Sequence, residues 1–183
     1  ITGTSTAGEF GIAVDNNTNV INSGNITLGS ATSTANANVG IYVKPSTAVP
    51  PTINTITNSA TITTGDNTLG VYGYAVDNTL GTITSGDNSV GIYTQGGNIN
   101  SGKINVGGQE SVAIFATGDS QNITLNDAIT LSDTSYGVVN KGTNSTITSN
   151  VPSVNLGNDN VFIYSSDVNG NITNNTTISS TGN

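Results

Sequence analysis

A four-residue motif recurs seven times along the chain and constrains its fold more than any other feature. Each copy has an apolar residue, a Gly or other small residue in most copies, then Ile or Val, and usually an aromatic residue. Measured from the second position, successive copies are 21 to 30 residues apart. The copies are Phe10-Gly11-Ile12-Ala13, Val39-Gly40-Ile41-Tyr42, Leu69-Gly70-Val71-Tyr72, Val90-Gly91-Ile92-Tyr93, Val112-Ala113-Ile114-Phe115, Tyr136-Gly137-Val138-Val139 and Val161-Phe162-Ile163-Tyr164.

Two further rows of β-branched residues recur in step with this motif. One is usually Thr-Ile-Thr and is centred on Ile26, Ile62, Ile83, Ile104, Ile129, Val154 and Ile178. A looser row contains Ile21, Ile56, Ile99, Ile123, Ile147 and Ile172. An Asn lies four residues before most members of the Thr-Ile-Thr row, at Asn22, Asn58, Asn100, Asn150 and Asn174. We expect these Asn to occupy matching turns, with interruptions at Thr79 and Asn126.

Each repeat therefore predicts three short strands separated by turns. Gly, Asn and Asp are frequent at the expected bends, where they adopt left-handed backbone angles at low cost. A single repeat is too small to bury its own apolar face, whereas stacked repeats bury a continuous core. The sequence thus predicts an all-β parallel β-helix, a solenoid of about seven coils, over residues 1–183. Stacked at about 4.8 Å per coil, it would form a rod roughly 34 Å long. An antiparallel sandwich explains neither the repeated motif nor the Asn row.

Composition and charge exclude several functions. The formal net charge is −8, and the basic residues are Lys44, Lys103 and Lys141. Nucleic acids and anionic lipids are bound through clustered basic groups, so neither is an expected partner. The chain contains no Cys or His, which excludes thiolate metal sites. We find no apolar run long enough to span a membrane, so direct membrane insertion of this segment is not expected.

The Asn-, Thr- and Gly-rich coils with their Gly-Ile/Val-Tyr rungs resemble the passenger region of large autotransporter adhesins of Gram-negative bacteria. The resemblance implies a right-handed coil, a location on the cell surface and adhesion as the default role. It also implies anchoring in the outer membrane through other regions of a longer protein. A chain that starts at Ile1 and ends within the pattern at Asn183 is expected to be an internal segment of such a protein.

The sequence does not favour catalysis, and we expect neither an enzyme nor a cofactor or metal site. Most acidic residues lie in turns beside Gly or Asn, where carboxylates accept backbone hydrogen bonds. A hydrolase needs converging carboxylates, and a lyase needs a base with cations for its acidic substrate. Asp66, Asp87 and Asp159 would together hold a calcium ion only weakly. Thr61/Thr63 and Thr82/Thr84 stack as in ice-binding solenoids, but Lys103 and Ala128 interrupt the array.

Two features are candidates for partner contact. If Ile or Val of the motif points inward, the next residue points outward, which predicts a row of exposed rings on one side of the rod. The second feature is a Pro-rich segment, residues 44–55, which is expected to leave the rod as a loop. The candidate contact residues are Tyr42, Tyr72, Tyr93, Phe115 and Tyr164 from the row of rings, and Lys44, Pro45, Pro50 and Pro51 from the loop.

The functional expectation is a surface-exposed adhesin or stalk segment that contacts a protein or glycan on a host or bacterial cell. One alternative is a carbohydrate-active β-helix whose active site lies outside this segment. Another is a subunit of a phage tail spike, for which an unbroken apolar outer stripe would favour trimerisation.

Overall fold

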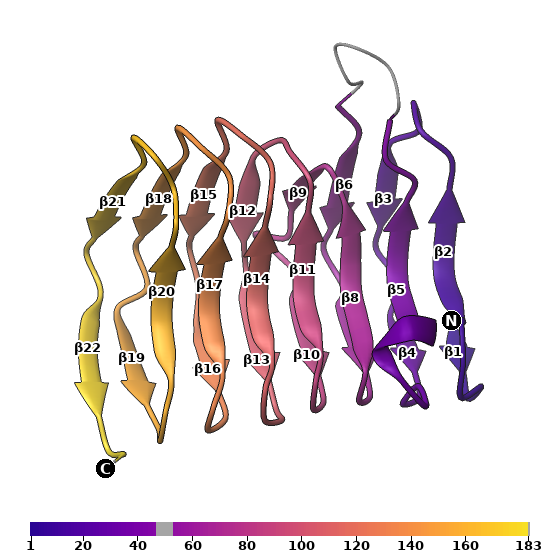
Figure 1. Ribbon diagram of the computed structural model, residues 1–183. Coiled ribbons are helices and arrows are strands. Elements are labelled where there is room, and N and C mark those ends of the chain that lie inside the picture. The colour runs from indigo at the N-terminus through magenta and orange to yellow at the C-terminus, as the bar shows by residue number, and fades with distance from the viewer. Residues whose placement is uncertain (47–52, 183) are drawn as a thin grey trace.

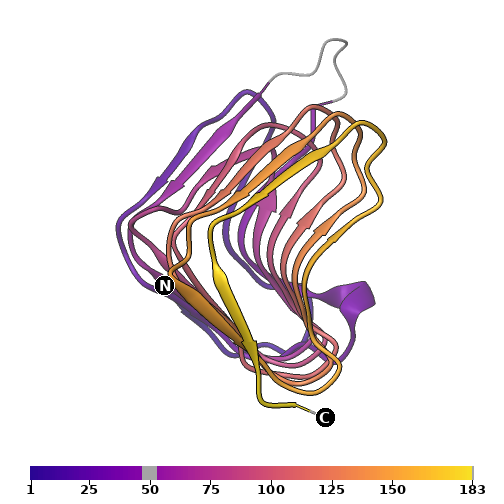
Figure 2. The ribbon, with the colours of Figure 1, turned by 90° about the vertical axis from the view of Figure 1, so that its left-hand side faces the viewer.

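The computed structural model describes residues 1–46 and 53–182 and shows a parallel β-solenoid of about seven coils (Figure 1). The chain passes through three parallel sheets in a fixed order, and each strand pairs with its counterparts in the coils before and after. Figure 2 shows successive coils following nearly the same three-sided path, with a short 3₁₀ helix, η1 (Thr34–Asn36), projecting from one corner. The predicted fold class is confirmed.

The three sheets are named A, B and C. Sheet A contains β1 (Thr2–Gly3), β4 (Ile26–Leu28), β7 (Thr61–Thr64), β10 (Thr82–Ser85), β13 (Lys103–Val106) and β16 (Ile129–Leu131). Sheet B contains β2 (Phe10–Val14), β5 (Asn38–Val43), β8 (Thr68–Gly73), β11 (Val90–Thr94), β14 (Val112–Ala116), β17 (Tyr136–Asn140) and β20 (Val161–Ser165). Sheet C contains β3 (Val20–Asn22), β6 (Thr55–Asn58), β9 (Ala75–Asp77), β12 (Ile99–Ser101), β15 (Asn122–Leu125), β18 (Thr146–Ser149) and β21 (Asn171–Asn174).

The last two strands along the side of sheet A, β19 (Ser153–Leu156) and β22 (Thr177–Ser180), pair with each other as a separate sheet. The connection that leads to β19 contains Pro152, whose carbonyl oxygen accepts the backbone N–H of Thr177 in the following coil over 3.2 Å. The break in pairing between β16 and β19 lies directly before β19, next to a residue that has no backbone N–H.

Three columns of aliphatic side chains fill the interior. In sheet B the motif residues Ile41, Val71, Ile92, Ile114 and Val138 are in register and fully buried. In sheet A the Thr-Ile-Thr row is in register from Ile26 to Ile129 and is likewise buried. Both predicted rows are confirmed over these coils, since their Ile and Val residues face the core in each of them.

The Gly of the motif lies where sheets A and B approach each other. A Cβ atom at Gly40 would lie 2.5 Å from the carbonyl oxygen of Gly70 and 2.6 Å from Cγ2 of Ile62. A side chain at this position therefore collides with backbone of the next coil and with the Thr-Ile-Thr row. This close approach explains why a small residue separates the two apolar positions in most copies.

The third row was predicted with one wrong member and one missing. Val20 pairs with Ile56, whereas Ile21 is 81% exposed. Val76 continues the row between Ile56 and Ile99 and is buried. An apolar pair such as Val20-Ile21 fits either register, and only the pairing with the next coil decides which residue is inside.

The Asn row is also corrected. Asn22 and Asn58 do occupy matching positions at the end of sheet C, and the amide of Asn22 donates to Oδ1 of Asn58 over 2.7 Å. The next member is Asn78, whose Oδ1 accepts from the Asn58 amide, also over 2.7 Å. Asn100 and Asn150, which were expected in this row, are exposed and lie one register position away from it. Ser101, Leu125 and Ser149 occupy the row instead, because the turn from sheet C to the next strand varies in length.

A second buried polar ladder lies at the start of sheet B and was not predicted. The backbone N–H groups of Thr68, Ser89 and Ser111 each donate to a hydroxyl one coil further on, at Ser89, Ser111 and Ser135, over 3.1 to 3.4 Å. Each of these residues follows a turn residue with positive φ, for example Asn88 and Thr134. The ladder satisfies polar groups that the turn brings into the interior.

Candidate functional site

The outer surface of sheet B carries the predicted row of rings. We call Tyr42, Tyr72, Tyr93, Phe115 and Tyr164 the aromatic stripe. Ala13 precedes the stripe and Val139 interrupts it, and all these residues are in register on successive strands. The predicted outward orientation is seen in the structure, since the four rings from Tyr42 to Phe115 are half-buried and point away from the core.

Ring contacts connect four coils of the stripe. Tyr42 and Tyr72 are stacked, with centroids 5.2 Å apart and planes 11° apart. Tyr72 and Tyr93 meet edge to face at 5.0 Å, and Tyr93 meets Phe115 in the same way at 5.2 Å. Phe10, from a neighbouring position of the motif, extends this series at Tyr42 with a centroid distance of 5.3 Å. Such geometries stabilise aromatic pairs beyond the burial of their area.

A second apolar row runs beside the stripe. The first residue of most motif copies also faces outward, because the small residue and the Ile or Val that follow it both face the core, whereas Val39 is buried. The members in register are Leu69, Val90, Val112, Tyr136 and Val161. We call the stripe and this row together the B face. The second row was not predicted, because strict alternation along the strand would place the Gly outside and the residue before it inside.

The B face is hollowed where side chains are small. Val139 separates the rings of Phe115 and Tyr164, and a hollow of about 420 Å³ lies there, lined also by Val112, Tyr136 and Lys141. The Lys141 ammonium lies 6.0 Å from the centroid of the Phe115 ring. This distance is compatible with a cation–π contact.

Burial raises the pKa of the Tyr72 hydroxyl, and the neighbouring hydroxyls of Tyr93 and Tyr42 raise it further. A hydrogen bond with the Gln95 side chain acts in the opposite direction. The neutral phenol is thus the favoured form within the stack. Gln95 also connects the aromatic stripe with the adjoining corner of the rod.

The Pro-rich segment begins directly after β5. Lys44 forms an exposed ion pair with Asp15 of the preceding coil, at 3.3 Å between Nζ and Oδ1. Both side chains are largely solvent-exposed, so the pair contributes little to stability. Pro45 is half-buried, and Pro50 and Pro51 lie outside the described residues.

The turn acids hold neighbouring coils together. Asp66 Oδ1 accepts the backbone N–H of Asp87 over 2.9 Å, and Asp87 Oδ1 accepts that of Gln109 over 3.1 Å. Asp133 accepts from the backbone of Asn158 in the same way. Within residues 1–46 and 53–182, no three His, Cys, Asp or Glu residues come together as a metal site. The same ranges contain no helix long and apolar enough to cross a membrane.

A groove that sequence reasoning missed lies at the corner between sheets B and C. In one coil a single residue, Tyr74, connects β8 to β9, whereas the next coil uses residues 95–98 and the one after uses residues 117–121. An open groove of about 950 Å³ lies at this corner, and residues from four successive coils line it. We call it the corner groove.

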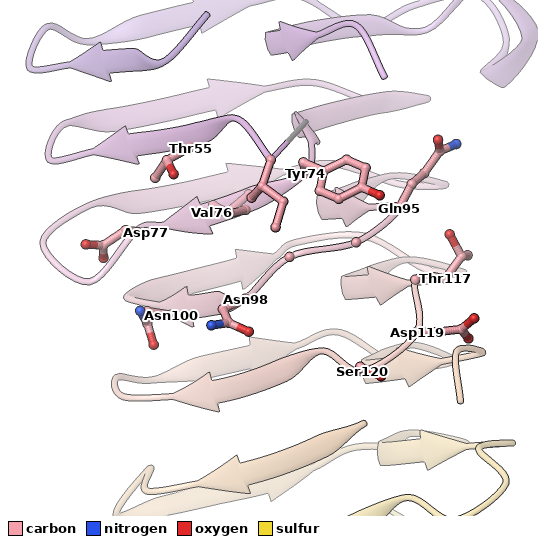
Figure 3. Close-up of a pocket in the computed structure, with 15 residues that line it drawn as sticks. Thr55, Tyr74, Val76, Asp77, Gln95, Asn98, Asn100, Thr117, Asp119 and Ser120 are labelled. Atoms are coloured by element: carbon pink, nitrogen blue, oxygen red, sulfur yellow. The ribbon is translucent and has the colours of Figure 1, made fainter. Parts of the chain in front are cut away.

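Figure 3 shows how side chains from separate coils surround the corner groove. Asp77 and Asn100 lie one above the other on one side, with Gln95 and Asp119 on the other and Tyr74 between them. No repeat motif marks these residues, because the groove arises from a difference between coils.

Comparison with known proteins yields no match, since no family model, no curated protein and no solved structure is similar to the chain. What the structure shows is a parallel β-solenoid with an apolar outer face on sheet B and an open groove, lined by polar and apolar residues, at the adjoining corner.

Proposed function

We propose that this chain is an adhesive segment of a surface-exposed rod and that the B face makes the contact. The observation that supports this proposal is the aromatic stripe, which runs in register along the rod on a chain otherwise rich in polar residues. Tyr and other aromatic side chains supply contact area at low entropic cost and are enriched at binding surfaces. The expected partner is a protein or glycan on a host or bacterial cell.

The resemblance to autotransporter passengers supports the same proposal. In this view the rod lies outside the cell, and other parts of a longer protein anchor it in the outer membrane. Stacked coils suit this task because each coil contacts only its neighbours, so length can be varied without redesigning the core.

The test is an adhesion assay with beads that carry the purified chain, applied to host-cell monolayers and to bacterial cells. The variant Tyr42→Ala/Tyr72→Ala/Tyr93→Ala should fold normally, because these rings lie outside the core, and should bind at least tenfold more weakly if each ring is an anchor. Binding by this variant as strong as that of the parent would reduce the segment to a spacer.

Matched controls distinguish the B face from the rest of the surface. Thr124→Ala/Thr148→Ala/Thr173→Ala removes three outward side chains that are in register on sheet C. Asp133→Asn changes a turn acid. Both controls should adhere like the parent, and a comparable loss in either would mean that adhesion does not depend on the B face.

A tail-spike-like subunit is a second candidate, favoured by the same apolar surface. In that case the B face would bury itself against other copies of the chain. Sedimentation would then show a trimer that the triple Tyr variant converts to monomers, whereas an adhesin would sediment alike with and without the three rings.

A further inference from the structure

We propose that the corner groove is a binding site for neutral oligosaccharides. The groove lies on a different side of the coil from the B face and involves different side chains. Saccharide binding there would therefore stand even if the B face made no adhesive contact.

The first argument is the hydrogen-bonding capacity of the groove. Asp77 and Asn100 are in register on adjacent strands, so their side chains lie one coil apart. Oδ1 of Asp77 accepts from the backbone and hydroxyl of Thr79, which fixes the carboxylate in place. Asn100 is exposed, and its side chain forms no hydrogen bond with any residue that the structure describes. An amide that donates and accepts beside a carboxylate that accepts matches neighbouring sugar hydroxyls, which do both.

The second argument is an aromatic ring held in a fixed position. The Tyr74 ring packs against the backbone of Gly96 so closely that a Cβ atom there would lie 2.6 Å from Cζ of the ring. Tyr74 is half-exposed and borders the groove. A ring with an apolar surface and a polar tip suits the mixed surface of a sugar, whose C–H groups lie beside its hydroxyls.

The third argument is that two more polar side chains of the groove are held in place by hydrogen bonds, Asp119 on the opposite wall and Asn98 beside Asn100 (Figure 3). Asp119 Oδ1 accepts both the backbone N–H and the hydroxyl of Thr143 over 2.8 Å. Oδ1 of Asn98 accepts the backbone N–H of Asn122 over 3.2 Å, which leaves its amide group as a donor. These bonds to the next coil hold the side chains in place before any ligand binds, which reduces the entropic cost of binding.

Charge selects among possible ligands. The groove contains the carboxylates of Asp77 and Asp119, and none of its described lining residues is basic. Sulfated, sialylated or uronic-acid glycans would therefore be repelled. A peptide that adds as a strand needs a free sheet edge. The strand on the floor of the groove, β9, already pairs with β6 and β12. A neutral saccharide carries no negative charge that these carboxylates would repel, and it needs no free sheet edge.

The experiment is an array of neutral and acidic oligosaccharides, probed with the purified 183-residue chain and followed by calorimetric titration of the best neutral ligand. We expect at least one neutral oligosaccharide to bind and acidic ones to be rejected. Tyr74→Ala and Asn100→Ala should each weaken binding about tenfold, the loss typical of a stacking contact or a well-placed hydrogen bond.

Matched controls are Ile21→Ala, an exposed apolar residue outside both the groove and the B face, and Asn126→Ala, an exposed Asn outside the groove. Asn100→Ala should fold like the parent, since the Asn100 side chain has no hydrogen-bond partner among the residues that the structure describes. Weaker binding by this variant would therefore not result from a folding defect. The proposal would be overturned if no neutral glycan bound, if acidic glycans bound better than neutral ones, or if both groove variants bound as strongly as the parent. The adhesion assay with the triple Tyr variant reports on the B face separately.

Discussion

At the residue scale, the turns of this solenoid place non-glycine residues in the left-handed region of backbone space. The turns that lead into sheet B contain Asn67 and Asn88 with positive φ, which is common for Asn. Two later coils have Glu110 and Thr134 at the same place, with φ of 54° and 57°. A β-branched residue there is strained, so Thr134 is a weak position in an otherwise regular turn.

Thr134→Asn should stabilise the chain by about 1 kcal/mol, because Asn adopts the left-handed conformation more readily and the Thr134 side chain is exposed. Thermal unfolding followed by circular dichroism would show a higher midpoint. Thr130→Asn is the matched control, since the same exchange within strand β16 should not stabilise. A lower midpoint for Thr134→Asn would mean that the Thr hydroxyl has a role in the turn.

At the element scale, the rows of buried residues could be predicted from sequence where equivalent strands of successive coils turn the same positions of the repeat toward the core. The motif in sheet B and the Thr-Ile-Thr row in sheet A meet this condition. Sheet C does not, because its connection to the following strand changes length. Asn78 lies five residues before Ile83, whereas Asn22 and Asn58 lie four before their Ile. A fixed spacing therefore selected Asn100 and missed Asn78.

The corner groove was beyond sequence reasoning for a related reason. Its shape depends on the one-residue connection at Tyr74 relative to longer connections in the next two coils. Its lining comes from four coils, and no spacing rule brings together Asp77, Asn98 and Asp119. The aromatic stripe, in contrast, repeats once per coil in most copies and could be read directly.

The stacked rings on neighbouring strands predict a response to alkaline pH. The pKa of Tyr72 is raised above its ordinary value of 10.0 in the folded chain, so the folded state holds this proton more tightly than the unfolded state. The resulting stabilisation is present below pH of about 10 and is lost as pH rises through the raised pKa.

Tyr72→Phe has no ionisable hydroxyl at this position and should lose less stability than the parent between pH 7 and pH 11. Urea unfolding at both pH values measures the effect, and the comparison at pH 7 corrects for the lost bond to Gln95. Equal losses in parent and variant would contradict the role of Tyr72 ionisation.

At the scale of the whole molecule, the two ends of the stack expose residues that are buried in the middle. Ile172 and Ile178 occupy core positions of the last coil but are 49% and 48% exposed. The terminal strands also present unpaired backbone groups, which favours pairing with other chains.

We expect the isolated 183-residue chain to associate end to end as its concentration rises. Ile172→Lys/Ile178→Lys should reduce this association, because charged side chains protect exposed sheet edges. Sedimentation velocity over a range of concentrations measures it. Leu80→Lys, at a residue 82% exposed between β9 and β10 in the middle of the stack, should leave association unchanged. A parent chain that stays monomeric throughout would refute this prediction.

The parallel pairing of every coil with the next also determines how the rod responds to force. Backbone hydrogen bonds run along the rod axis, so tension between its ends loads the coils in series and pulls them apart one after another. A coil of 24 residues, such as that from Ala113 to Tyr136, contributes only about 4.8 Å to the folded rod. Once peeled away and extended, the same residues span about 80 Å. Under tension such a rod lengthens stepwise, one coil at a time, and each released coil relieves the load on the coils that remain stacked.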